Sequence, residues 1–94
     1  MINRNHYGII TFSNSQAAAQ AEIKIQASGF ECRLIPLPEQ IHSGCGLVLQ
    51  FSLEDLNLLR NSLSDLNNLS MKIYEVILSK NRKKTVLLLE PKEE

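Results

Sequence analysis

The fold of this 94-residue chain is decided by the stretch HYGIITFSNSQAAAQAEIKIQASGFECRLIP, residues 6–36. Its first part, residues 6–12, is short, rich in β-branched and aromatic side chains, and followed at once by small polar residues. That combination is typical of a strand that leads into a helix. From residue 15 to residue 28, alanines and an isoleucine recur at steps of three and four, which predicts an amphipathic helix.

The two ends of this helix carry recognisable signals. Ser13 or Ser15 is expected to accept a hydrogen bond from the first-turn amides, because hydroxyl side chains are good helix N-caps. Gly29 is expected to end the helix in a left-handed conformation.

A second strand is predicted over residues 30–36. Phe30, Cys32 and Leu34 lie on one face of the alternating pattern, with Glu31 and Arg33 on the other, until Ile35 interrupts it. Residues 46–51 are its expected antiparallel mate, and Pro36 and Pro38 stiffen the start of the loop between them.

The second half of the chain repeats the pattern of helix and strand. Ser52 is expected to cap a helix that ends near Asn67 and Asn68, with an apolar stripe of Leu56, Leu59, Leu63 and Leu66. Residues 71–79 predict a further strand, and residues 85–90 an additional one that returns by a hairpin.

Without that last run, the order is β-α-β-β-α-β. This order predicts an α+β fold of the ferredoxin-like split β-α-β type, with two helices on one face of an antiparallel sheet and a possible extra C-terminal strand. The length favours one domain over residues 1–94, with a core of 7–79 and a C-terminal extension of 80–94.

Ten basic and ten acidic residues give the chain a formal net charge of zero. Such a chain has no long-range field to attract nucleic acid or an anionic membrane, so neither is an expected partner. The one basic cluster, Lys80 with residues 82–84, is interpreted as a solvated turn. No apolar run approaches the ~20 residues that cross a bilayer, and the N-terminus does not resemble a signal peptide, so a cytoplasmic location is expected.

The two cysteines are expected to be free thiols and have different settings. Cys32 shares its strand face with apolar residues and is assigned to the core. Cys45 stands between Gly44 and Gly46, in a loop that the topology places at the end of the sheet where the first helix begins, beside Ser13, Asn14 and Ser15.

Two interpretations of Cys45 are open from the residues alone. The positive end of the helix dipole would stabilise a thiolate, and glycines on either side would leave the sulfur accessible. A free cysteine is more often a small buried hydrophobe, with Gly-Cys-Gly a tight entry into a strand. His42 is a possible base near the sulfur, although an exposed loop histidine is the commoner case. His6, Cys32, His42 and Cys45 do not make a convincing zinc set, so no metal and no other cofactor is expected.

Residues 7 to about 78 resemble the family of small selenium/sulfur carrier-like proteins. The most specific element is an Arg-x-Ile-Pro-x-Pro run that leads through a short loop to Ser-x-Cys-Gly, here Arg33, Ile35, Pro36, Pro38, Ser43, Cys45 and Gly46. The resemblance implies that Cys45 carries the chalcogen as a persulfide or perselenide. Two positions where the family often has a basic residue hold Glu39 and Gln50 instead.

The leading hypothesis is therefore a thiol carrier rather than an independent catalyst. It would take sulfur or selenium from a desulfurase-type donor and pass it to an acceptor protein, with Arg33 orienting the partner and the Ser13 and Asn14 amides stabilising charge. The alternative is a noncatalytic ferredoxin-like module that binds a small ligand or a protein at the same place, with an incidental cysteine. The apolar C-terminal run also allows a homodimer by pairing of sheet edges.

Overall fold

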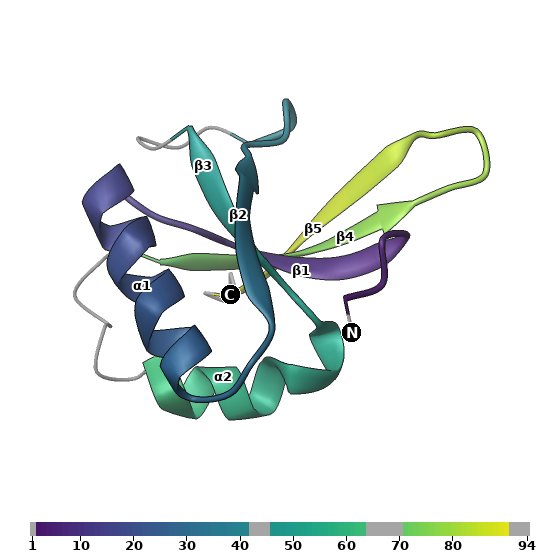
Figure 1. Cartoon of the computed structure of the whole chain (residues 1–94). Helices are drawn as coiled ribbons and strands as arrows, with labels where there is room; N and C mark the ends of the chain where they lie inside the picture. Colours follow the sequence, from purple (N-terminus) through teal and green to yellow (C-terminus); the bar gives the residue numbers. More distant parts are fainter. Residues whose placement is uncertain (1, 42–45, 64–70, 91–94) are drawn as a thin grey trace.

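The computed structural model describes residues 2–41, 46–63 and 71–90. Within these ranges the chain has an α+β fold with one five-stranded sheet and two α-helices (Figure 1). In chain order the elements are β1 (His6–Thr11), α1 (Ser15–Ala27), β2 (Cys32–Pro36), β3 (Leu47–Phe51), a 3-10 turn (Leu53–Asp55), α2 (Leu56–Leu63), β4 (Lys72–Leu78) and β5 (Lys84–Glu90).

The strands follow the order β2-β3-β1-β4-β5, and every neighbouring pair is antiparallel. β1 is central: its Gly8 lies opposite Phe51 of β3 on one side and Glu75 of β4 on the other. The α+β class and the hairpin between the last two strands are confirmed. β5 lies outside β4, so the observed order differs from that of a four-stranded sandwich by this additional strand.

The main core lies between the sheet and the two helices. α1 contributes small residues, so it packs close to the strands, and α2 contributes the fully buried Leu59. The buried members of this cluster are Ile10, Phe12, Ala17, Ala18, Ala21, Ile25, Cys32, Leu49, Phe51, Leu59 and Ile73. The predicted apolar face of α1 is therefore the face that is buried.

The other face of the sheet has a second core, to which neither α1 nor α2 contributes a described residue. Its buried residues are Tyr7, Ile9, Ile41, Val48 and Val76, with Ile2, Ile35, Leu37, Tyr74 and Val86 packed against them. The segment that follows β2 therefore covers part of this face. Ile35 breaks the apolar/polar alternation of β2, as noted from the sequence, because its side chain packs on the second core.

The start of α1 differs from the prediction in one detail. The N-cap is Asn14, not Ser13 or Ser15: its side-chain oxygen accepts a hydrogen bond from the Ala17 amide at 2.8 Å. Asn14 has an extended backbone, which directs the side chain back toward the first turn. At the other end, Gly29 has a φ of 90°, as expected for a left-handed helix stop.

We expect Asn14→Ala to lower the free energy of unfolding by about 1 kcal/mol, because the Ala17 amide loses its hydrogen-bond acceptor. Urea denaturation followed by circular dichroism measures this change. Ser13→Ala and Ser15→Ala are the matched controls and should each change stability by less than about 0.5 kcal/mol. A larger loss in either serine variant than in Asn14→Ala would contradict the assignment.

The second helical region also differs in detail from the expectation. It opens with the 3-10 turn, and the Ser52 side chain makes no capping hydrogen bond; the Ser52 carbonyl instead accepts from the Asp55 amide at 3.0 Å. The expected helix end near Asn67 lies outside the described residues, as does Leu66. In the described part of the chain, no helix is both long enough and apolar enough to span a bilayer.

Candidate functional site

Three elements meet at one end of the sheet. Ile10 near the end of β1 pairs with Leu49, and Pro36 at the end of β2 pairs with Leu47 at the start of β3. Only three residues separate the end of β1 from the start of α1, so the N-terminus of α1 lies at the same end (Figure 1). The predicted placement of the β2–β3 loop and the helix start at one end of the sheet thus agrees with the strand register.

The predicted reactive cysteine falls outside the described residues. Cys45 lies there together with His42, Ser43 and Gly44. Their proposed roles stay predictions.

The residues on either side of this segment are described. Before it, the amide of buried Ile41 donates to the Pro38 carbonyl at 3.1 Å. After it, the carbonyl of exposed Gly46 accepts from the Leu37 amide at 3.0 Å. A Cβ built on Gly46 meets no atom within 4 Å, so this glycine borders open space. Ile41 and Gly46, the described residues nearest Cys45 on either side in the sequence, are therefore both hydrogen-bonded to the loop that follows β2.

Ser13 and Asn14 are exposed at the helix start, on the helix-covered side of the sheet. The Asn14 side chain is used in capping, and its carbonyl accepts from the Ala18 amide at 3.3 Å. This leaves the positive end of the α1 dipole near the same end of the sheet as Gly46. Whether it acts on Cys45 stays a prediction.

Cys32 is a core residue, as the sequence indicated. It is a free thiol with only 7% of its surface exposed, and its Sγ donates to the Glu22 carbonyl at 3.9 Å. Burial, and secondarily the negative charge of the Glu22 side chain, raises the pKa of the Cys32 thiol from 9.0 to about 11. At neutral pH this residue is a protonated thiol, which is a poor nucleophile.

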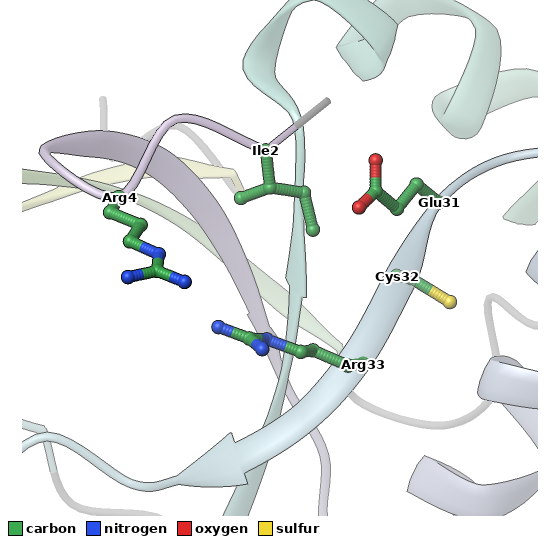
Figure 2. Close-up of a pocket in the computed structure, with 5 residues that line it drawn as sticks. All are labelled: Ile2, Arg4, Glu31, Cys32 and Arg33. Carbon is green, nitrogen blue, oxygen red and sulfur yellow. The ribbon is translucent and has the colours of Figure 1, made fainter.

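Arg33 projects from the opposite face of β2. Its Nε donates to Gln50 Oε1 at 2.8 Å, across the β2–β3 pair. Figure 2 shows its guanidinium pointing toward that of Arg4, whereas the sulfur of Cys32 points away from both. These three residues, with Ile2 and Glu31, line a small cavity of about 160 Å³.

A larger open groove of about 660 Å³ lies on the helix-free face, between the loop after β2 and the turn between β4 and β5. We call it the basic groove; it is lined by Arg33, Ile35, Pro36, Leu37, Pro38, Glu39, Gln40, Gln50, Arg82, Lys83 and Lys84. Its two walls are joined where Gln40 Nε2 donates to the Lys84 carbonyl at 3.4 Å.

The basic groove was not predicted from the sequence. The basic cluster is in a turn, as predicted, and backbone bonds between Ser79 and both Arg82 and Lys83 close that turn at 3.0 Å. Its residues are exposed, as the solvated turn predicts, and three of them also line the groove. The two departures from the family motif, Glu39 and Gln50, also line it. No local signal indicates this, because the pairing of distant strands brings these residues together.

No group of three potential metal ligands among His, Cys, Asp and Glu occurs within the described ranges. His6, at the start of β1, instead contacts the Glu75 carboxylate of β4 through its Nε2. The described residues thus offer no assembled metal centre.

Comparisons with known proteins place the chain in a family. No curated protein and no solved structure matches it. One family model, described as Putative Se/S carrier protein-like, matches residues 7–75, which is more than half of the chain and includes both cysteines. The chain therefore belongs to the Se/S carrier protein-like family.

Proposed function

We propose that this protein is a sulfur or selenium carrier that holds the transferred atom on Cys45 as a persulfide or perselenide. The observation that carries the proposal is the burial of Cys32 in the helix-side core. The chain has two cysteines, and a buried thiol with a raised pKa is unsuited to exchange with another protein. Family membership supports carrier chemistry, and Cys45 is the cysteine left to perform it.

The proposed step is a transfer of sulfane sulfur between two thiols. The Cys45 thiolate attacks the outer sulfur of a persulfide on the donor enzyme, so a new S–S bond forms as the donor's S–S bond breaks. The donor cysteine leaves as a thiolate, and the persulfide proton stays with the transferred sulfur or passes to solvent. No net oxidation occurs, and the same exchange in the opposite sense delivers the atom to an acceptor.

The residues around Cys45 have supporting roles in this proposal. Gly44 and Gly46 give access to the sulfur, and the open space beside Gly46 supports that role. Arg33 orients the partner from the adjoining strand. The remaining proposed contributors are Ser13, Asn14, His42 and Ser43.

The proposal extends to the fold type, the cellular location, the protein partners and the oligomeric state. We group the fold with the ferredoxin-like split β-α-β sandwiches, which is supported by the central position of β1 between β3 and β4 and by the shared helix-side core. A cytoplasmic location and desulfurase-type donor and acceptor proteins belong to the same proposal. So does a homodimer through the outer edge of β5, which size-exclusion chromatography would detect.

Incubation with a cysteine desulfurase and free cysteine tests the carrier proposal. We expect intact-protein mass spectrometry to show one added sulfur on the wild-type chain, located on Cys45 by peptide mapping. Cys45→Ser should lose the added mass completely. Cys32→Ser is the matched control and should still be loaded, because its thiol is buried.

Iodoacetamide labelling as a function of pH provides the second measurement. Cys45 should label with a lower apparent pKa than a free thiol, whose pKa is about 8.5. A wild-type chain that gains no sulfur and labels like an ordinary thiol would contradict the carrier proposal and favour the noncatalytic module. Loading that survives in Cys45→Ser would also contradict it.

A further inference from the structure

The basic groove has an excess of positive charge in a chain whose formal net charge is zero. Four of its lining side chains are cationic, Arg33, Arg82, Lys83 and Lys84, against the single carboxylate of Glu39. Within the described residues, none of the four forms an ion pair, and the ion pair described is His6 with Glu75. Their charge is therefore available to a bound anion.

The floor of the groove has donors in fixed positions. Gln50 is only 4% exposed, and its Oε1 accepts the hydrogen bond from Arg33 Nε at 2.8 Å. This bond holds the Arg33 side chain and leaves its two terminal nitrogens as a fork, a geometry that suits an oxyanion. It also fixes the Gln50 amide so that its NH₂ group is the remaining donor, for which no acceptor occurs among the described residues.

Arg33 also lies close to a second arginine. Its guanidinium and that of Arg4 point toward each other on the groove-side face of β2 (Figure 2). Two facing cations repel each other, and an anion between or beside them relieves that repulsion. Arg33 therefore lines two hollows: the small cavity, together with Arg4 and the carboxylate of Glu31, and the basic groove, together with the cationic residues 82–84.

We propose that the basic groove binds a small organic molecule that carries a phosphate-type oxyanion. Arg33 and the Gln50 amide would hold the oxyanion at the floor, and Arg82, Lys83 and Lys84 would close around it from the β4–β5 turn. The volume of about 660 Å³ is within the range of small-molecule sites, roughly 300–1,000 Å³. The apolar wall from Ile35 to Pro38 would contact the rest of the molecule.

This site gives the C-terminal hairpin a role. The turn residues Arg82–Lys84 lie beyond residues 7–75, the part matched by the family model. The hairpin thus supplies most of the positive charge of the groove. Oxyanion binding in the groove does not depend on thiol chemistry, because no cysteine is among the described residues that line the groove.

An NMR titration of the full ¹⁵N-labelled chain with ribose 5-phosphate tests the proposal. We expect saturable shifts at Arg33, Gln50 and residues 82–84, and none with ribose alone. Arg33→Gln should weaken binding about tenfold or more, the loss expected for a charge-assisted hydrogen bond. Lys84→Gln should weaken it in the same direction.

The controls separate this site from general charge effects. Lys80→Gln makes the same change of charge in the same turn at a residue that does not line the groove, so it should bind like the wild type. Cys45→Ser should also bind like the wild type, which distinguishes this proposal from the carrier function. Thermal melts of each variant verify that it is folded.

Several results would overturn the proposal. These are the absence of saturable shifts, shifts centred outside the groove, and equal weakening by Lys80→Gln and Lys84→Gln. Inorganic phosphate that binds as tightly as ribose 5-phosphate would overturn the assignment of an organic ligand. Binding of a poly-glutamate peptide without binding of ribose 5-phosphate would show a surface for acidic polypeptides instead.

Discussion

Gly8→Ala should destabilise the protein by about 3 kcal/mol, at the upper end of the cost of overfilling a core. A Cβ built on Gly8 lies 2.3 Å from Cζ of Phe51 and 2.6 Å and 2.7 Å from two further ring atoms. Phe51 is fully buried in the helix-side core, so its ring can withdraw only by moving among other core side chains. Because Gly8 and Phe51 are directly opposed in the β1–β3 pair, the added methyl group must displace either the ring or a strand.

Urea denaturation of four variants measures this effect: Gly8→Ala, Gly46→Ala, Phe51→Leu and the double variant Gly8→Ala/Phe51→Leu. Gly46→Ala is the matched control, since a Cβ there meets no atom within 4 Å, and it should change stability by less than about 0.5 kcal/mol. Phe51→Leu removes the ring atoms that clash, so Gly8→Ala should cost less in that background than in the wild type. Equal costs in the two backgrounds would contradict the proposed clash.

Leu59→Ala should destabilise the protein by about 2–5 kcal/mol, the usual cost of truncating a buried leucine and leaving a cavity. Leu59 is fully buried and belongs to the helix-side core that also contains α1 residues such as Ala21 and Ile25. Its loss weakens the attachment of α2 to the rest of the molecule.

The neighbouring Leu58 is a close control for this prediction. Leu58 is also a leucine in α2, but it is 57% exposed. Leu58→Ala should change the free energy of unfolding by less than about 0.5 kcal/mol. Equal losses in the two variants, measured by urea denaturation, would show that α2 packs on the core through a different face.

The candidate site could be predicted from the sequence only in part. The alternation in residues 30–36 correctly separated Cys32, on the buried face, from Arg33 on the other. The assignment of Cys32 to the core follows from that pattern, because side chains in a strand alternate between faces. Cys45, the residue singled out as reactive, lies outside the described residues, so its role remains a prediction.

Two local details of the sequence depended on the tertiary structure. Ser13, Asn14 and Ser15 can all cap a helix, and the choice of Asn14 depends on which residue has the extended backbone at the junction with β1. Ile35 breaks the apolar/polar alternation because the face of the sheet opposite the helices is not fully solvated. The loop after β2 and the N-terminal segment bury part of that face.

By itself, the sequence determined the strands, the position and apolar face of α1, and the burial of Cys32. These features depend on contacts between near neighbours and on the repeat of apolar residues. Only the tertiary structure decided the strand order, the second core and the basic groove. The groove brings Arg33 and Gln50 together with Arg82, which lies more than thirty residues further along the chain, and pairing at that range depends on how the whole sheet is assembled.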